Sequence, residues 1–531
     1  MRKYLYICIA LAAATLLVAG CGSSGKAASS TKSGSSQTYA ELRWGFPAFP
    51  GPIDYVKSGW FAAAAIQHLA VQNLVEFTSD GSVKPALASS IERSGPTTYV
   101  FKLRPGIKFS DGRPLTVADV VYSLEHDARG KESVLSAYWE DMSSVSAQGN
   151  SVVVKLKRPN ASWLGLMAYS SQVFEKADAE KVGEKALGTP GYPLIGTGPW
   201  KIDSFKPEAS VELSRNPYWT GPKQPAEKIS ITIFKEESAT SLALRSGAID
   251  GTFIILAPKV FTSLPGNQEL SAPGATTMLL GMDTEKPPFN DVHVRRAIAY
   301  AIDAPAIAKA LFGDQGSPLQ TILPPSILAY LGTPSQVKEM LSEVPKYEFN
   351  LAKAKEELAK SAYPHGFTTE LQAQTAERSN VLFFEALVPY LAKIGIKATV
   401  HEIHNDEVAG WLTKKTTAAI SEEGAAFPDP ESIFLQFLPA SEISPPGSGA
   451  NFARYKNPAV DKLYKEQSEA LNPATRRQLM GKMLTIIANE AAYVGLLTHT
   501  WVGWLSEKYV FPSFSWWATF GPWALDVKKA S

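Results

Sequence analysis

The stretch YVFKLRPGIKFSDGRPLTVADVVYSLE, residues 99–125, decides how this part of the chain folds. Apolar and polar side chains alternate, though imperfectly, over 99–104, and this alternation predicts a strand with one buried face. A Pro-Gly pair ends that strand, and an Asp-Gly pair further along predicts a turn. Thr116 and Asp119 then form a capping box, in which each side chain can bind the other residue's amide. A helix is therefore predicted to begin after Thr116.

These features alone describe a strand, a turn and a capped helix without chemistry, because helix caps are far commoner than functional sites. The stretch nevertheless resembles the hallmark segment of the peptide-binding family of ABC-importer substrate-binding proteins, also called solute-binding protein family 5. Residues 80–88 resemble that family's lead-in, and further matches lie at 289–303, 350–367 and 472–490. The resemblance covers nearly everything after residue 40.

The resemblance implies an α/β chain with the two-lobed fold of periplasmic binding proteins, an inserted subdomain in the first lobe and two hinge crossings. The expected division is a signal peptide at 1–20, a flexible tether at 21–38, lobe 1 at 39–75, its inserted subdomain at 76–195, lobe 1 again at 196–283, lobe 2 at 284–498, and the C-terminal part of lobe 1 at 499–531. We expect 278–283 to be the outgoing crossing strand and 494–499 the return strand.

The composition is that of an ordinary globular chain, with 45% hydrophobic and 19% charged residues among 531. At about 150 residues per domain, this length predicts roughly three domains. The formal net charge is +1, and no basic run is present, so nucleic-acid binding is not expected. The two cysteines are Cys8 and Cys21. A mature chain cut before Cys21 would contain no disulfide, and cysteine-based metal sites and thiol catalysis are excluded.

The first twenty residues predict a lipoprotein signal peptide. Two basic residues precede an apolar run at 5–19, which is short for a membrane span of about 20 residues. Val-Ala-Gly-Cys at 18–21 resembles a lipobox, so Cys21 is expected to carry a lipid; an ordinary secretory signal with a chance cysteine is the alternative. The Gly- and Ser-rich segment at 22–38 predicts a flexible tether. The body is thus expected on the extracytoplasmic face of the cell membrane, attached through the lipid anchor only.

Several enzyme motifs are absent from the sequence: there is no phosphate loop, no Gly-x-Ser-x-Gly elbow and no His-Glu-x-x-His. The nearest approach to a metal site is His401 with His404, and a strand would place these on opposite faces. A solvated strand end is therefore favoured, and neither a metal nor a cofactor is expected. The carboxylate pairs at 236–237 and 422–423 are interpreted as surface acidity.

Aromatic side chains are candidates for lining the cleft between the lobes, because the chain has 12 Trp, several of them clustered toward the C-terminus. Such rings offer a large contact area at small entropic cost. Trp44, Phe46, Met282 and Trp501, near the expected hinge, are the preferred lining residues. Core packing is the commoner role for any single aromatic residue and is the alternative for each ring.

Residues 424–431, GAAFPDPE, resemble the family's Asp-aromatic-x-Asp-Pro loop in the second lobe. The resemblance implies that the first aspartate of this loop binds the α-amine of a peptide. Here Ala426 takes that place, Phe427 is the aromatic residue and Asp429 is the second acid. The missing carboxylate removes a charge-assisted bond worth about 1.5–3 kcal/mol. Either Asp429 or Glu423 substitutes for it, or the register of the match is one residue off, or the ligand is not an ordinary free-amine peptide.

The resemblance implies an extracytoplasmic substrate-binding lipoprotein, acting as a monomer. It would capture a peptide or peptide-like solute by lobe closure and deliver it to an ABC permease and ATPase complex. The alternatives are a binding lipoprotein for a non-peptide solute, such as an oligosaccharide or an opine, and a ligand sensor. A hydrolase is disfavoured because no nucleophile-base motif is present.

Overall fold

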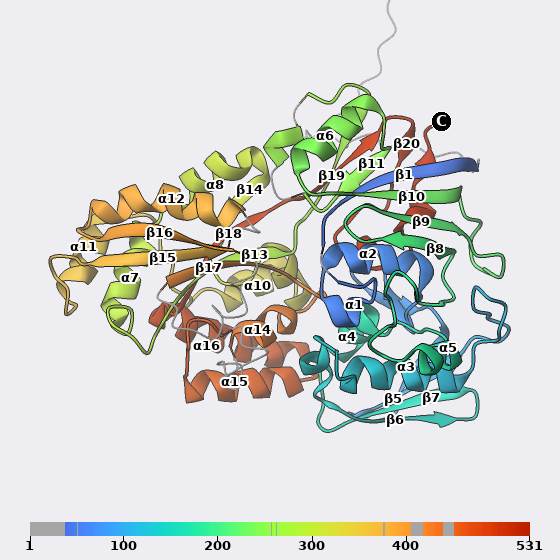
Figure 1. The fold of residues 1–531 in the computed structure, drawn as a ribbon. Helices are drawn as coiled ribbons and strands as arrows, with labels where there is room; N and C mark the ends of the chain where they lie inside the picture. The colour runs from blue at the N-terminus through green and yellow to red at the C-terminus, as the bar shows by residue number, and fades with distance from the viewer. Residues whose placement is uncertain are drawn as a thin grey trace, which may run out of the picture.

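The computed structural model describes residues 38–49, 51–255, 258–261, 263–374, 378–404, 418–438 and 451–531. Within these residues the chain forms two lobes that lie side by side, each built on its own sheet (Figure 1). The expected signal peptide, Cys21 and nearly all of the tether lie outside the described residues. Among the described residues, no helix has both the length and the apolar character needed to cross a membrane.

The first lobe is built on a seven-stranded sheet to which both ends of the chain contribute. In spatial order its strands are β12 (Asn267–Ala272), β19 (Trp501–Ser506), β11 (Gly251–Phe253), β1 (Tyr39–Pro47), β10 (Ala226–Phe234), β9 (Ser210–Arg215) and β8 (Trp200–Lys206). β1 pairs in parallel with both of its neighbours and is therefore a central strand. Its side chains Leu42, Trp44 and Phe46 are fully buried, as expected for one face of a covered strand.

The inserted subdomain is a four-stranded antiparallel sheet with helices on one side, at the lower right of Figure 1. Its strands are β4 (Ala88–Arg93), β5 (Thr98–Leu103), β7 (Ser151–Leu156) and β6 (Met142–Gln148). Its helices include α3 (Val117–Arg129), η1 (Ser136–Trp139), α4 (Trp163–Ser170) and α5 (Lys176–Val182). The capping box at the start of α3 is confirmed: Thr116 Oγ1 accepts from the Asp119 amide, and the Asp119 carboxylate accepts from the Thr116 amide at 2.8 Å.

The second lobe is built on a six-stranded sheet. Its strands, in spatial order, are β14 (Gly316–Pro318), β18 (Tyr493–His499), β13 (Thr276–Met282), β17 (Ala418–Gly424), β15 (Thr368–Gln374) and β16 (Lys397–Ile403). Helices around it include α7 (Val292–Ala301), α8 (Ala304–Phe312), α11 (Leu351–Ala359), α12 (Arg378–Ala392), α14 (Glu431–Phe437), α15 (Pro458–Glu469) and α16 (Pro473–Glu490). Asn350 and Asn472 cap α11 and α16 with their side-chain oxygens, which fixes where both helices begin.

The chain crosses between the lobes at 273–275 and again at Thr500. β12 belongs to the first sheet and β13 to the second, and likewise β18 belongs to the second and β19 to the first. The expectation that 278–283 is the crossing strand, with lobe 1 extending to residue 283, is therefore corrected. β13 is flanked on both sides by second-lobe strands, and Met278 and Met282 pack into that lobe's core. The 494–499 segment is also a strand of the second lobe, and the return follows directly after it.

The two crossings touch each other. A Cβ added at Gly274 would lie 1.8 Å from the His499 carbonyl oxygen, so only glycine allows this approach of the two backbones. Beside them, the Ala425 amide donates to the Ala275 carbonyl at 2.8 Å. The loop that follows β17 therefore begins at the hinge.

Candidate functional site

The loop after β17 is where the second lobe meets the first. The Trp516 indole Nε1 donates to the Ala425 carbonyl at 2.9 Å. On the other side of the loop, a Cβ added at Gly165 of α4 would lie 3.3 Å from Phe427. The loop thus contacts both the C-terminal segment of the first lobe and its inserted subdomain. The lobes are closed upon each other at this point.

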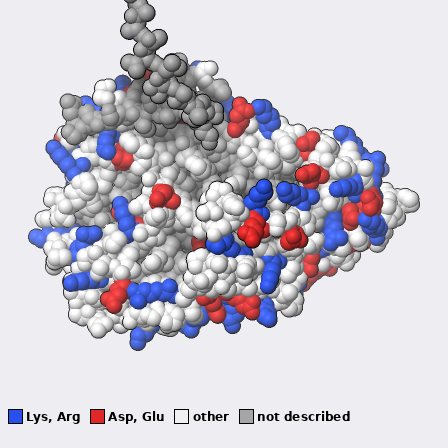
Figure 2. Space-filling model, turned by 180° about the vertical axis from the view of Figure 1, so that it is seen from behind, with Lys and Arg blue, Asp and Glu red and all other residues white. Residues whose placement is uncertain are grey.

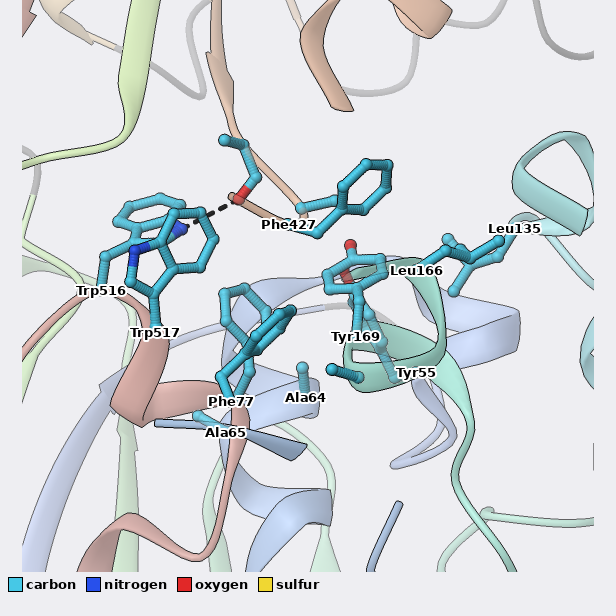
Figure 3. Packing of buried hydrophobic residues seen from close by; sticks show 14 of the residues in the cluster. Tyr55, Ala64, Ala65, Phe77, Leu135, Leu166, Tyr169, Phe427, Trp516 and Trp517 are labelled. Atoms are coloured by element: carbon cyan, nitrogen blue, oxygen red, sulfur yellow. Dashed lines mark hydrogen bonds between the residues drawn. The ribbon is translucent and has the colours of Figure 1, made fainter. Parts of the chain in front are cut away.

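A group of aromatic rings fills the contact, and we call it the aromatic seam. It consists of Phe61, Tyr138, Tyr169, Phe427, Trp501, Trp516 and Phe520. The Phe427 centroid lies 6.1 Å from that of Tyr138 and 6.4 Å from that of Tyr169. Tyr169 contacts Phe520 at 5.2 Å, and contacts of 4.6 to 5.4 Å connect Phe520 to the remaining rings. Figure 3 shows Phe427 and Tyr169 facing each other, with Trp516 further to the left, next to Trp517.

Of the residues predicted to line the cleft, Trp501 lies in the seam and the other three do not. Trp44 and Phe46 are fully buried in the core of the first lobe, where both contact Trp523. Met282 is fully buried in the core of the second lobe. Each of these three side chains lies on a covered face of a strand inside its sheet, and its contact with a solute stays a prediction.

Within the loop, Phe427 belongs to the seam and Ala426 is buried next to it. Asp429 instead points into the second lobe, where its carboxylate forms a bidentate pair with the Arg476 guanidinium at 2.5 and 2.6 Å. One of its oxygens also accepts from the Glu431 amide at 2.9 Å. Bidentate Arg–carboxylate pairs are among the stronger hydrogen-bonded contacts in proteins. Asp429 is therefore engaged within its own lobe, and its role toward a ligand stays a prediction.

Glu423, the other proposed substitute, lies on β17 close enough to the seam to act on Tyr138. Burial raises the pKa of Tyr138, and the negative charge of Glu423 raises it further. Both Tyr138 and Tyr169, whose pKa burial also raises, are therefore neutral phenols at physiological pH. Burial lowers the pKa of His68 to about 3, so this imidazole, whose ring packs edge-on to Phe520, is neutral as well.

The loop is anchored from behind by a buried carboxyl group. Glu431 accepts from the Tyr464 hydroxyl at 2.5 Å and from the Gln467 amide at 2.7 Å. Gln467 in turn accepts from Arg476 Nε at 3.1 Å. Burial raises the pKa of Glu431 to about 7, against the lowering effects of Tyr464 and Arg476. A network on α15 and α16 thus holds the loop in place.

The same helix α15 touches the inserted subdomain. The Ala161 amide donates to the Ser468 carbonyl at 2.8 Å across the lobe boundary. Next to it, Arg158 Nε lies 2.7 Å from the Asp141 carboxylate and 4.0 Å from Glu469. Closure therefore has a second contact, outside the seam, that joins the subdomain to the second lobe.

The carboxylate pair at 422–423 is not simply surface acidity, because Glu422 is buried. Its side chain is 6% exposed and lies 2.7 Å from Nε2 of His499, which is 5% exposed and precedes the return crossing. Burial by itself would raise the pKa of Glu422. The nearby His499 and a hydrogen bond from Ser379 outweigh burial, so the pKa of Glu422 lies below its ordinary value. Burial by itself would lower the pKa of His499. The Glu422 carboxylate outweighs burial, so the pKa of His499 lies above its ordinary value. The two groups form a buried ion pair at the hinge.

The structure gives no sign of a metal centre in the part of the chain that it describes. No three His, Cys, Asp or Glu side chains there are grouped to hold an ion. His401 is half exposed, with the Glu370 carboxylate at 3.7 Å. On the face shown in Figure 2, basic and acidic side chains are interspersed, without a field of one sign. This face therefore does not steer a ligand of either charge.

Sequence reasoning missed most of the seam. Trp516 belongs to the C-terminal tryptophan cluster, which was a usable signal. Phe61, Tyr138 and Tyr169 come from three separate segments, and no local pattern relates them. Only their tertiary contacts with Phe520 and Phe427 identify them.

Similar proteins were found at the level of both sequence and structure. The chain is 27% identical over 532 residues to heme-binding protein A of Haemophilus influenzae, covering 92% of each chain. It is 26% identical to the glutathione-binding protein GsiB of Escherichia coli, covering 80% of this chain and 82% of the relative. These values indicate distant relatives of nearly the same length.

Solved structures confirm the two-lobed fold. The periplasmic binding protein DppA from Helicobacter pylori, in complex with peptide STSA, superposes with a TM-score of 0.79 at 22% identity, covering 93% of this chain and 98% of that one. MoaA from A. tumefacien R10, in complex with mannopinic acid, also gives a TM-score of 0.79 at 22% identity, covering 93% and 100%. At such identities the likeness concerns the fold alone.

The sequence model described as "Bacterial extracellular solute-binding proteins, family 5 Middle" matches residues 82–445, which is more than half of the chain. This match includes the capped helix α3, the inserted subdomain and most of the second lobe. The chain belongs to family 5 of the bacterial extracellular solute-binding proteins, the substrate-binding components of ABC transporters.

Proposed function

We propose that this protein captures a peptide or peptide-like solute between its lobes and delivers it to an ABC permease and ATPase complex. One observation carries the proposal: the loop after β17 begins at the hinge and meets the aromatic seam across the lobe boundary. A solute bound there touches both lobes at once. Its binding energy therefore acts directly on closure.

Closure is a rotation about the two short crossings at 273–275 and Thr500. Opening separates Trp516 from Ala425 and Ala161 from Ser468, and it exposes the rings of the seam to solvent. Closing over a solute expels that water again. A solute bound at micromolar strength supplies about 8 kcal/mol, which exceeds a conformational cost of a few kcal/mol. The permease would then recognise the closed form.

The solute class rests on the relatives and on the geometry together. The relatives and neighbours are named for glutathione, heme, the peptide STSA and mannopinic acid. Glutathione and STSA support a peptide-like solute, whereas mannopinic acid supports an opine. One fold hosts many ligands, so the residues of the site, and not the fold, determine which solute binds. A peptide or peptide-like molecule is the first candidate, and an opine, another amphiphile or an oligosaccharide is the alternative.

We propose further that the protein is a monomer anchored by a lipid on Cys21 at the extracytoplasmic face of the cell membrane. The lipobox-like Val-Ala-Gly-Cys and the Gly- and Ser-rich segment after it support the anchor. Firm attachment needs more than one acyl chain, because a single chain binds a membrane only weakly.

Mass spectrometry of the small molecules that co-purify with the protein tests the proposed function. We expect a peptide or peptide-like solute, and its addition to stripped protein should reduce the radius of gyration in small-angle X-ray scattering. Deletion of the gene should abolish uptake of that solute. Normal uptake after deletion would favour a sensor instead, and recovery of the added solute in cleaved form would favour a hydrolase.

A further inference from the structure

We infer that the solute is held by an apolar or aromatic group packed against the aromatic seam, and that its binding does not depend on a free α-amine. This inference rests on the proposed function and narrows it. It concerns the chemistry of the group that enters between Phe427 and the first lobe.

The first argument is the state of the acids in the loop. Ala426 provides only a methyl group to the loop. Both oxygens of Asp429 are bound by the Arg476 guanidinium, and that pair is mostly buried. A ligand amine would have to displace a bidentate guanidinium, leaving its charge buried and unpaired. The loop therefore offers no carboxylate to an ammonium group.

The second argument is the neutrality of the seam. Each of its members is an aromatic hydrocarbon ring, an indole or a phenol, and the nearby imidazole of His68 is neutral. Figure 3 shows the Tyr169 hydroxyl directed toward Phe427 and away from the core below it. Aromatic surfaces of this kind bind apolar groups through contact area and edge-to-face geometry. An ammonium group would gain a cation–π contact with these rings, but the rings supply it no anionic partner.

The third argument is the polarity of the remaining hydrogen-bonding groups. The Trp501 indole Nε1 is buried and has no acceptor among the described residues. An indole only donates, so it matches a carbonyl or carboxylate oxygen of the solute rather than an ammonium. Buried donors normally find a partner, and a solute oxygen that reached Nε1 would supply one.

Among the described residues, Glu423 is an acid whose charge reaches the edge of the seam, where it acts on Tyr138. It stands on β17, three residues before Ala426, and outside the loop itself. If Glu423 recognised an amine, free-amine and acetylated ligands would differ strongly in affinity. The experiment therefore includes a Glu423→Gln variant.

Isothermal titration calorimetry with four probes tests the inference: triphenylalanine and trialanine, each with a free and with an acetylated N-terminus. For the wild-type protein we expect the two triphenylalanine forms to bind within threefold of each other. Both should bind at least tenfold more tightly than either trialanine form. Phe427→Ala should weaken triphenylalanine binding about tenfold. Phe349→Ala is the matched control, because that ring is 38% exposed in the same lobe and contacts Tyr390 outside the seam.

Ala426→Asp provides a gain of function on the same four probes. It should make free-amine triphenylalanine bind about tenfold more tightly than the acetylated form, because it introduces a carboxylate into the loop beside Phe427. Glu423→Gln should leave the ratio of the two forms unchanged.

Each contrary result overturns the inference. One such result is a preference above tenfold for the free-amine form in the wild-type protein, or the loss of such a preference in Glu423→Gln. The others are equal affinity for trialanine and triphenylalanine, and binding of none of the probes. None of them alone overturns the proposed function. That function fails only if three results coincide. No solute co-purifies with the protein, no solute makes it more compact, and no solute needs it for uptake.

Discussion

The buried carboxyl group of Glu431 predicts a specific dependence of stability on pH. Its pKa in the folded protein is about 7, against an ordinary value of 4.5, because burial disfavours its charged form. The folded state therefore holds this proton more tightly than the unfolded chain does. The stabilising contribution is complete below about pH 4.5 and is lost as the pH rises through 7. A shift of this size corresponds to about 3 kcal/mol of unfolding free energy.

Glu431→Gln should remove that dependence. A neutral amide reproduces the protonated carboxyl group, since its oxygen can accept from Gln467 and its NH₂ can donate to the Tyr464 hydroxyl, which is free to rotate. At pH 4.5 the variant and the wild-type protein should have the same stability. At pH 8 the variant should be the more stable by up to about 3 kcal/mol.

Urea denaturation of both proteins at several pH values between 4.5 and 8 measures this difference. The Glu422–His499 pair is present in both proteins, so its own titration cancels when one curve is subtracted from the other. Glu466→Gln is the matched control, because Glu466 lies on α15, the helix that carries Tyr464 and Gln467, but is 44% exposed and pairs only loosely with Lys462 at 3.8 Å. A stability difference between Glu431→Gln and wild type that stays constant over this pH range would refute the reasoning.

Three further predictions concern the loop anchor, the hinge and the membrane attachment. Arg476→Met should cost about 3–5 kcal/mol of unfolding free energy in urea, because it strands the buried Asp429 carboxylate; a loss below 1 kcal/mol would argue against that role. Gly274→Ala should cost about 1–3 kcal/mol and lower the melting temperature, since its methyl group collides with the His499 carbonyl; an unchanged melting temperature would contradict this. Cys21→Ala should release the protein into the medium, and the lipobox interpretation fails if the variant stays on the membrane without a detectable lipid.

Local structure was predictable wherever neighbouring residues determine it. The capping box of Thr116 and Asp119 starts α3 as expected, because both hydrogen bonds are made within one turn of helix. The caps of Asn350 and Asn472 are local for the same reason. Resemblance to a family then supplied the two-lobed fold, which no local pattern contains.

The hinge was placed only approximately. A strand's sequence shows that it is buried but not which sheet buries it, and β13 is apolar enough to suit either lobe. Its pairing with β17 and β18 decided the matter in favour of the second lobe. Glu422 was misjudged in the same way, because its buried partner His499 is remote in sequence.

By itself, the sequence determined the elements, the family and the identity of the loop that carries Ala426, Phe427 and Asp429. Tertiary structure alone decided that Asp429 is neutralised by Arg476, and that Phe427 meets rings from three distant segments. The physical reason is that periodicity reports which side chains share a face. What covers that face depends on long-range packing between segments, and that packing becomes visible only once the chain has folded.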